Sequence, residues 1–545
     1  MEIIINILSS KRLTALVLLS WVLTIFFALW FVHPRVDDGI YLIPAISTFQ
    51  INFPGVNFSN SVEPIFFIFP TQPYLHGIFL KILDFFFIDI NLHTYRIFNY
   101  LCVMTLFYLV YKLFSAVFPN SKYRIFSFNL SLVLLGFSQF SLQFYVNRPE
   151  IPGLVFLMLG IYYFVKLVKN NKKRKLYTSI FSFSLGVSSI FHPNLSILSI
   201  LILGYCSYLI ISNFGIIYLK NLASFFMPIC ILFIWFALNA DAVQGQLFNR
   251  VQEVSSFSMP SINNILSTIA GDESLPLVHN LYLAAYMVTL LISLLVLVFY
   301  IFKGFKADTT DSIEKVFIML GISTLIILLV MQPFRPYYLL VSFLSVISIS
   351  FFITKHLSLS NYVKSTSLEE NSRSSYAKSF LFIPLILLPL TFPISHTAKI
   401  SLSNEAYDNH HNTINVLEKY LIEDRHFFIT SAQLLPIFTS SIVLDFRSNM
   451  RKIHWYFPAA DSPDQRFKKL FQDDINTDYQ LMSNAIWGGL SRTLTFNDSN
   501  SIACFTLKGG IFVINIYNPV TIFKDRNNIF LTSSTVAPSN KCFDQ

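Results

Sequence analysis

The sequence has few charged residues. Of its 545 residues, 13% are Asp, Glu, Lys or Arg, whereas soluble domains carry about 25%. Hydrophobic residues make up 54% of the chain, and Phe (58) and Tyr (26) are abundant. This composition excludes an ordinary soluble protein and predicts that most of the chain is embedded in a membrane. The formal net charge of +9 does not indicate nucleic-acid binding, because the basic residues stand in short loops between apolar runs.

Several motifs that carry chemistry in other proteins are also missing. The sequence has no Gly-rich phosphate loop, no zinc-ligand spacing and no Gly-x-Ser-x-Gly elbow. The adjacent His410 and His411 lack the helical spacing that would aim two imidazoles at one metal. No cleavable signal peptide is expected, because no small-residue cleavage site follows the first apolar run, 13–32. No internal repeat is visible, which argues against transporter folds built from repeats.

Cysteine is scarce, with five residues in the chain. Cys102, Cys206 and Cys230 lie in apolar runs, so we expect them to be unreactive packing residues. Cys504 and Cys542 lie in the polar C-terminal segment. They would form a disulfide if that segment is extracytoplasmic, and two unpaired thiols fit the sequence equally well.

Eleven apolar runs are long enough, or nearly so, to cross a bilayer as helices. They lie at 13–32, 97–117, 125–144, 151–168, 177–191, 195–212, 221–240, 280–302, 316–332, 337–354 and 380–395. A further run, 74–90, is interrupted by four ionisable side chains. If 74–90 lies in the interface, all Lys- and Arg-rich loops fall on the same side as Lys11 and Arg12; if it crosses the membrane, they do not. The positive-inside rule therefore predicts an amphipathic interfacial helix at 74–90 and a cytoplasmic N-terminus.

The predicted fold is a polytopic α-helical membrane protein with about eleven spans and a soluble domain at its C-terminus. Residues 1–395 form the transmembrane domain, with interfacial helices within 33–95. Residues 396–545 are richer in charge, Asn and Ser, and short apolar runs such as CFTLKGGIFVINIYN, with its Gly-Gly turn, predict strands. With eleven spans this soluble α/β domain is extracytoplasmic.

The predicted topology leaves a small set of cations on the outer side of the membrane domain. They are Arg35, Lys81, Arg96, Arg148, Arg250 and Arg335. Such groups could hold an anionic headgroup such as a phosphate, or could only anchor helix ends at the interface, and for any single residue the two readings are about equal. On the same side, the adjacent acids Asp37 and Asp38 directly follow the first apolar run.

In their order along the chain, these motifs resemble the polytopic GT-C glycosyltransferases, in particular the branch of protein O-mannosyltransferases and the lipid A aminoarabinose transferase. That branch has an acidic pair after the first span, here DDGIYL in place of the commoner Asp-Glu form. A Pro-led juxtamembrane helix follows, here QPYLHGIFLKILDFFF, and then a span that opens with Arg, here Tyr95-Arg96-Ile97. Arg148-Pro149-Glu150 opens the fourth span, and RPYYLL at 335–340 stands near the last spans, with an inserted Pro.

The resemblance implies an inverting glycosyltransferase that takes a sugar from a polyprenyl-phosphate-linked donor lipid. The acceptor, a glycolipid, polysaccharide or protein, would receive it at the outer face of the plasma (inner) membrane. By motif position Asp37 is the general base and Asp38 a second acid. The implied donor-phosphate ligands are Lys81, Arg96, Arg148 and Arg335, and the implied supporting residues are Glu63, His76, Glu150, His192 and Tyr337.

Among the supporting residues, Glu150 is expected to form a salt bridge with an Arg, and His76 and His192 to be interfacial polar groups. No cofactor is certain. A divalent cation held by Asp37 or Asp38 stays open, because the usual Asp-x-Asp spacing of a metal site is absent.

Three other functions remain compatible with the sequence. A polyprenyl-lipid flippase or transporter would also use cations at the membrane face, but it needs neither an outer soluble domain nor an acid pair in the first loop. An O-antigen polymerase or ligase would place its main polar loop between late spans. In a receptor-like scaffold the outer domain would carry all the function, and an Asp37→Asn change would leave that function intact.

Overall fold

The computed structural model describes the helical part of the chain most completely. The described residues are 6–31, 41, 44–49, 52, 55–58, 61–64, 69–88, 90, 92–136, 140, 144, 148–170, 172–240, 298, 312–330 and 339–364, together with the strand segments 427–429, 453–455, 479–483, 501–507 and 510–516. The descriptions below concern these residues.

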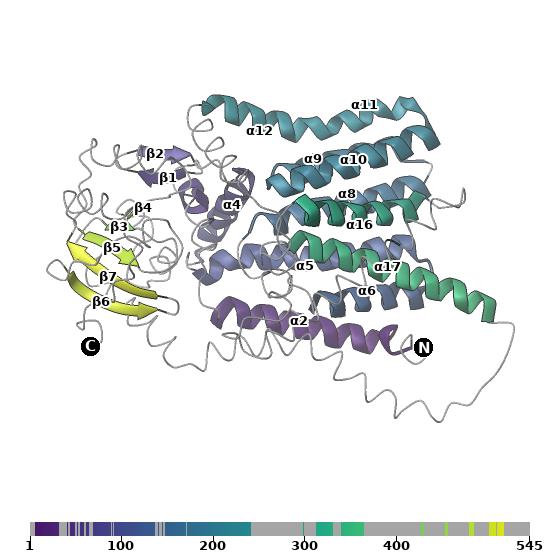
Figure 1. The fold of residues 1–545 in the computed structure, drawn as a ribbon, viewed down its shortest axis with the longest axis horizontal. Coiled ribbons are helices and arrows are strands. Elements are labelled where there is room, and N and C mark those ends of the chain that lie inside the picture. Colours follow the sequence, from purple (N-terminus) through teal and green to yellow (C-terminus); the bar gives the residue numbers. More distant parts are fainter. Residues whose placement is uncertain are drawn as a thin grey trace, which may run out of the picture.

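A bundle of long helices that run side by side forms the body of the molecule (Figure 1). Its helices are α2 (Lys11–Phe31), α5 (Leu92–Val117), α6 (Ser121–Gly136), α8 (Glu150–Lys169), α9 (Arg174–Ser189), α10 (Pro193–Phe214), α16 (Ser312–Val330) and α17 (Leu339–Lys364). A further rod consists of η1 (Ile216–Tyr218), α11 (Leu219–Leu222), η2 (Ala223–Phe225) and α12 (Phe226–Leu238). We call the end where α2 begins, and where α5, α8 and α10 finish, the basic end.

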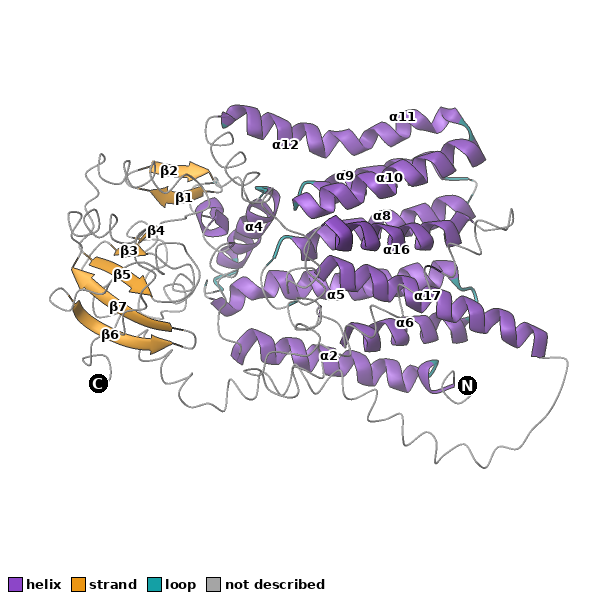
Figure 2. Ribbon diagram, viewed as in Figure 1, coloured by secondary structure: helices purple, strands orange, loops and turns teal. Residues whose placement is uncertain are grey.

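The opposite end of the bundle is defined by a helix that crosses it. Helix α4 (Thr71–Phe85) lies at a steep angle to the long helices, beside the points where α5, α8 and α10 begin (Figure 1). We call this the α4 end. The described strands lie beyond it, away from the bundle (Figure 2).

Most predicted spans correspond to a helix. Within the predicted span 125–144, helix α6 is described as far as Gly136, and beyond Gly136 the structure describes only residues 140 and 144 of that span. The predicted span 221–240 is interrupted by the 3-10 turn η2. Just before this turn, the carbonyl of Leu222 accepts a hydrogen bond from Ser182 Oγ of α9 at 2.5 Å. The predicted span 380–395, and all of 280–302 except residue 298, lie outside the described residues.

Four helices among the described residues are long and apolar enough to cross a membrane. They are Thr94–Val117, Glu150–Lys169, Pro193–Phe214 and Ile216–Leu238. Helix α2 shows what surrounds the bundle, because both of its faces are apolar. On the face toward the core, Val17, Trp21 and Ile25 are each 1% exposed. On the other face, Leu19 and Phe26 are 59% and 51% exposed. A helix that is apolar all round belongs in a core or in lipid, so the protein is a multi-pass membrane protein.

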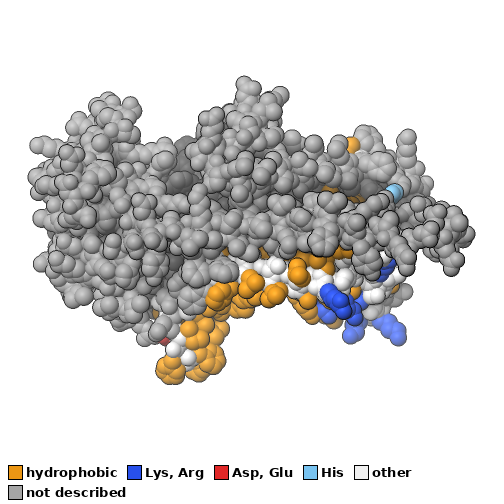
Figure 3. Space-filling model, turned by 90° about the horizontal axis from the view of Figure 1, so that it is seen from below, with side chains coloured by type: hydrophobic (Ala, Val, Ile, Leu, Met, Phe, Trp, Pro, Cys, Tyr) orange, Lys and Arg blue, Asp and Glu red, His pale blue; other side chains and the backbone are white. Residues whose placement is uncertain are grey.

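One face of the molecule shows the same distribution at larger scale. In Figure 3 hydrophobic side chains cover the described part of that face, and Lys and Arg side chains gather toward one end. An exposed apolar surface of this extent is explained by a lipid environment.

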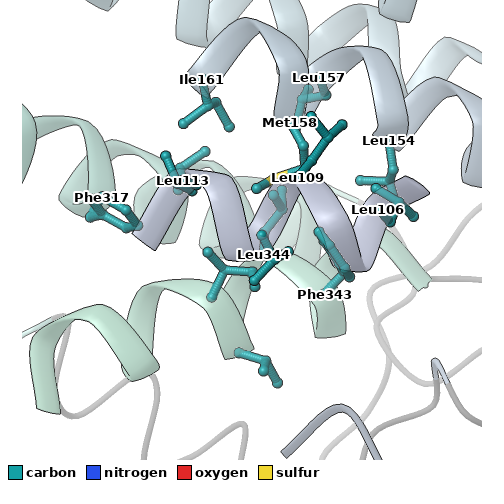
Figure 4. Packing of buried hydrophobic residues seen from close by; sticks show 14 of the residues in the cluster. Leu106, Leu109, Leu113, Leu154, Leu157, Met158, Ile161, Phe317, Phe343 and Leu344 are labelled. Carbon is teal, nitrogen blue, oxygen red and sulfur yellow. The ribbon is translucent and has the colours of Figure 1, made fainter. Parts of the chain in front are cut away.

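The core of the bundle is built by helices that are far apart in sequence. Leu106, Leu109 and Leu113 of α5 meet Leu157 and Met158 of α8, and α16 and α17 close the same cluster with the aromatic and aliphatic side chains shown in Figure 4. These side chains interdigitate without charged partners. The core therefore holds the two ends of the bundle at a fixed distance from each other.

The described strands form two sheets. Strands β1 (Gly55–Phe58) and β2 (Ser61–Pro64) make an antiparallel hairpin. The second sheet has the order β4-β3-β5-β7-β6 and consists of β3 (Phe427–Ile429), β4 (Ile453–Trp455), β5 (Tyr479–Ser483), β6 (Ser501–Leu507) and β7 (Gly510–Ile516). Strands β3, β4 and β5 pair in parallel, and β7 pairs antiparallel with both β5 and β6. The hairpin predicted at the Gly-Gly turn is confirmed, with Leu507 opposite Gly510.

Candidate functional site at the α4 end

Helix α4 joins elements that are far apart in sequence. At its start, Thr71 Oγ1 donates to the carbonyl of Ile190, 2.7 Å away, in the loop between α9 and α10. Its buried face carries the polar residues Gln72 and His76 together with Leu80 and Leu83, and its exposed face carries Ile78 (50%) and Ile82 (49%). An apolar exposed face on a helix that crosses the end of a membrane bundle agrees with the predicted interfacial position.

His76 is a structural residue rather than the interfacial polar group predicted from the sequence. Its side chain is fully buried and stacks on Tyr95 of α5, with the ring centroids 4.1 Å apart. Nε2 lies 2.9 Å from the Tyr95 carbonyl and Nδ1 lies 3.3 Å from Gln72 Nε2. A carbonyl can only accept, so Nε2 carries the proton and Nδ1 accepts from Gln72. Burial lowers the pKa of His76 to about 3, because desolvation disfavours the charged ring. The neutral ring pins α4 to α5.

Arg148 and Glu150 form a buried ion pair where α8 begins. Nε and Nη2 of Arg148 donate to the two carboxylate oxygens of Glu150 at 3.1 and 2.6 Å. The two side chains are 7% and 1% exposed. The carboxylate lies in the first turn of α8, where the helix dipole favours a negative charge. This bidentate geometry fixes the plane of the guanidinium group.

His192 approaches the same carboxylate from the neighbouring helix. It caps α10, with Nδ1 accepting from the backbone N–H of Asn194 at 3.2 Å. Nε2 must therefore carry the ring proton, and it lies 3.8 Å from Oε1 of Glu150. The sequence predicted only an interfacial polar group at His192. In the structure His192 also joins the start of α10 to the start of α8, through its contact with Glu150.

Arg96 lies where the first span ends. Its side chain is 1% exposed, and Nη1 lies 3.4 Å from the carbonyl of Ala28 near the end of α2. The last carbonyls of a helix lack partners within the helix, and a cation there also complements the helix dipole. Arg96 thus stabilises the end of α2, the helix that precedes Asp37 and Asp38 in the sequence.

Lys81 contacts a residue that follows Asp37 and Asp38 in the sequence. Its Nζ donates to Oδ1 of Asn52, a residue with a left-handed backbone (φ 62°). Of the cations predicted on the outer side, the structure describes Lys81, Arg96 and Arg148, and all three contact protein groups near the α4 end. The structure thus brings together the predicted residues Lys81, Arg96, Arg148, Glu150, His76 and His192 at one end of the bundle.

Other predicted site residues are placed only in part. Asp37, Asp38, Arg335, Tyr337 and Cys542 lie outside the described residues. The backbone of Glu63 lies in β2 opposite Val56, and that of Cys504 lies in β6 opposite Val513. Within the part of the chain that the structure describes, no three His, Cys, Asp or Glu side chains form a group that could hold a metal ion.

The sequence analysis did not identify two residues of this region, Gly77 and Asn52. Helical residues 44–49, which follow Asp37 and Asp38 in the sequence, lie directly against α4 at Gly77. The signal that could have revealed this is a glycine inside an amphipathic helix, which is often required by close packing.

The fold and these contacts define a class: a multi-pass membrane protein with a crossing helix and a buried ion pair at one end of its bundle. Residues 70–238 match the sequence family described as dolichyl-phosphate-mannose-protein mannosyltransferase. This segment runs from the start of α4 to the end of α12 and includes Lys81, Arg96, Arg148, Glu150 and His192. No curated protein matches the sequence.

Solved structures share the architecture. ArnT from Cupriavidus metallidurans in the apo state has a TM-score of 0.53 and 12% identity, over 92% of this chain and 98% of ArnT. ArnT bound to undecaprenyl phosphate also gives 0.53, with 11% identity over 93% of this chain and 98% of ArnT. The apo oligosaccharyltransferase of Archaeoglobus fulgidus gives 0.47, with 12% identity over 86% of this chain and 69% of that protein.

At this identity the likeness to ArnT shows a shared fold. Together with the family match over 70–238, it confirms the resemblance to the polytopic GT-C glycosyltransferases.

Proposed function

We propose that this protein is a membrane glycosyltransferase that moves a sugar from a polyprenyl-phosphate donor to an acceptor hydroxyl at the α4 end. The observation that carries the proposal is the buried Arg148–Glu150–His192 cluster, which lies inside the segment that matches the mannosyltransferase family. Arginine is a frequent ligand of phosphate groups because its planar guanidinium group carries five N–H donors, of which the contact with Glu150 uses two. The undecaprenyl phosphate bound to ArnT, which has the same fold, supports the donor class.

The reaction needs a base and a stabilised leaving group. Asp37 would accept the proton of the acceptor hydroxyl as its oxygen attacks the anomeric carbon from the face opposite the lipid phosphate, so that the configuration inverts. The bond between the anomeric carbon and the phosphate oxygen breaks, and the phosphate leaves with the bonding electron pair. Arg148, with Arg335 and Lys81, would stabilise the negative charge that develops on it. Glu150 and His192 keep the Arg148 guanidinium in place.

The distribution of cations supports an orientation. The described loops and helix termini at the basic end carry Lys11, Arg12, Lys122, Arg124, Lys169, Lys172, Lys173, Arg174, Lys175 and Lys220. By the positive-inside rule we propose that this end faces the cytoplasm and the α4 end faces outward. A single cysteine introduced at Lys173 should resist a membrane-impermeant thiol reagent in intact cells and react after the membrane is opened. Labelling in intact cells would contradict this orientation.

The function can be tested without knowing the sugar. Purified protein in liposomes is given a panel of undecaprenyl-phosphate sugars together with a membrane extract that supplies acceptor hydroxyls, and release of free undecaprenyl phosphate is measured. We expect release with at least one donor, and loss of release in Arg148→Ala. Movement of the donor lipid between leaflets without any cleavage would instead support the flippase alternative and overturn the proposal.

A further inference from the structure

The described residues on either side of Asp37 and Asp38 in the sequence contact α5 and α4. Before the two aspartates, the Ala28 carbonyl of α2 lies against Arg96 of α5. After them, helical residues 44–49 lie on α4, and Asn52 accepts from Lys81. In the sequence, the two aspartates thus stand between two stretches that contact the same pair of helices.

The contact at α4 depends on Gly77 having no side chain. A Cβ placed on Gly77 would lie 2.6 Å from Cβ of Thr48, 2.7 Å from Cγ2 of Thr48 and 2.8 Å from the Ala45 carbonyl oxygen. Contacts shorter than 3.0 Å are essentially never found around a real Cβ. Thr48 is 2% exposed, and its hydroxyl donates to the Pro44 carbonyl at 2.8 Å, so it has little room to move away. Any side chain at 77 would push residues 44–49 off α4.

The contact at Asn52 adds a second constraint one turn along α4. Asn52 N donates to the Thr48 carbonyl at 3.0 Å, so this residue ends the same helical segment. Its left-handed backbone (φ 62°) turns the chain out of the helix, and asparagine tolerates that conformation better than most residues. The side-chain amide then accepts from Lys81.

We propose that Gly77 and Asn52 are positioning residues for the base, an inference that rests on the proposed function. They hold residues 44–49 and Asn52, which follow Asp37 and Asp38 in the sequence, against α4. Gly77 acts by letting residues 44–49 lie directly on α4, and Asn52 acts by fixing the end of that segment to Lys81. Neither residue touches the reacting atoms. Moving the base away from the acceptor hydroxyl slows the chemical step but leaves the contacts that bind the donor unchanged. We therefore expect a lower kcat and an unchanged donor KM.

The main experiment compares two glycine substitutions in full-length protein in liposomes. Gly77→Ala introduces the clash described above. Gly204→Ala is the matched control, because a Cβ at Gly204 of α10 meets nothing within 4 Å. We expect Gly77→Ala to lower kcat on the order of 10²-fold with the donor KM nearly unchanged, and Gly204→Ala to behave like the unmodified protein. Exchanging the glycine, as Thr48→Gly combined with Gly77→Ala, removes two of the three clashing atoms and should restore part of the lost rate.

A cross-link tests the placement independently of activity. Cysteines replace Asn52 and Lys81 in a protein whose native cysteines are removed, and a short bismaleimide should join them. Adding Gly77→Ala should lower the yield, and a pair at Asn52 and Lys173, at opposite ends of the bundle, should not react. A high yield together with no cleavage of any donor by the unmodified protein would overturn the proposed function while leaving this placement intact.

Other outcomes would overturn the inference itself. Equal kcat values for Gly77→Ala and Gly204→Ala would do so, and so would a raised donor KM with unchanged kcat. If Gly77→Ala does not fold, variants of Asn52 test the proposal instead, because Asn52 is exposed and its substitution should not prevent folding. Asn52→Gly keeps the left-handed backbone and loses the Lys81 contact, and Asn52→Ala loses both. Both should lower kcat, alanine more than glycine, and unchanged kcat in both variants would contradict the proposal.

Discussion

The two ends of the helical bundle use positive charge in different ways. At the basic end many Lys and Arg side chains are exposed, including Lys11, Lys173 and Lys220. At the α4 end the described cations are few, and Arg96 and Arg148 are 1% and 6% exposed. An exposed cation keeps its hydration, whereas a buried one must be satisfied by protein groups or by a ligand. The number of cations at an end of the bundle thus indicates membrane orientation, and the burial of those cations indicates a site.

The ion pairs at the two ends differ in the same sense. Arg148 and Glu150 are almost entirely shielded, with side chains 7% and 1% exposed. Lys355 and Glu314, at the basic end, lie 2.5 Å apart with side chains 26% and 12% exposed. Removing the carboxylate therefore leaves a buried positive charge on Arg148 but a partly exposed positive charge on Lys355.

The largest effect should follow from neutralising the acid pair at the α4 end. Asp37→Asn should lower sugar transfer by about 10²–10⁴-fold, the usual contribution of a general base, and Asp38→Asn should have a smaller effect. Lys173→Gln, at the basic end, should leave the rate unchanged. Release of undecaprenyl phosphate is the measurement. If Asp38→Asn proves more damaging than Asp37→Asn, the base is Asp38.

The next effect concerns stability and compares the two ion pairs directly. Glu150→Gln leaves the Arg148 charge buried without its carboxylate, and we expect a loss of about 3–5 kcal/mol in the free energy of unfolding. Glu314→Gln leaves Lys355 partly exposed, and the loss should be about 1 kcal/mol or less. Thermal unfolding in detergent measures both. Equal losses would mean that burial does not distinguish the two ends.

A third prediction concerns pH and the buried histidine. His76 is neutral in the folded protein, with a pKa near 3, and in the unfolded chain it takes up a proton below about pH 6.5. Its contribution to stability is therefore complete above pH 6.5 and falls as the pH drops from 6.5 toward 3, with a slope approaching about 1.4 kcal/mol per pH unit. Unfolding followed between pH 7 and pH 4.5 should show a shallower dependence in His76→Gln.

Features of the fold and the candidate site that depend on a local sequence pattern could be predicted, and contacts between residues far apart in the sequence could not. Spans such as α8 follow from apolar runs, because their lengths match a bilayer. The Arg148–Glu150 pair follows from its spacing of two residues around Pro149. The Gly77–Thr48 contact and the stacking of His76 on Tyr95 join residues whose separation carries no local pattern. The break at η2 depends on Gly186 of α9, where an added Cβ would collide with the Phe225 carbonyl, and hydropathy does not report such contacts.

The smallest expected effect concerns the apolar turn at the end of α4. Phe87 is 97% exposed with a left-handed backbone (φ 58°), and the neighbouring Phe85 and Phe86 are 76% and 64% exposed. A bulky residue rarely adopts that backbone conformation, and in water the exposed ring would add a second cost. Burial of the ring in lipid at the α4 end would offset that cost.

Phe87→Trp should therefore show blue-shifted emission, measured as the difference from the unmodified protein with its five tryptophans. Phospholipids brominated near the headgroup should quench it. Lys173→Trp at the basic end, placed where hydrated cations predominate, should emit as a water-exposed indole. If bromine leaves the emission of the Phe87→Trp indole unchanged, the turn lies in water, and the apolar exposed face of α4 must then be covered by another part of the protein or by a partner.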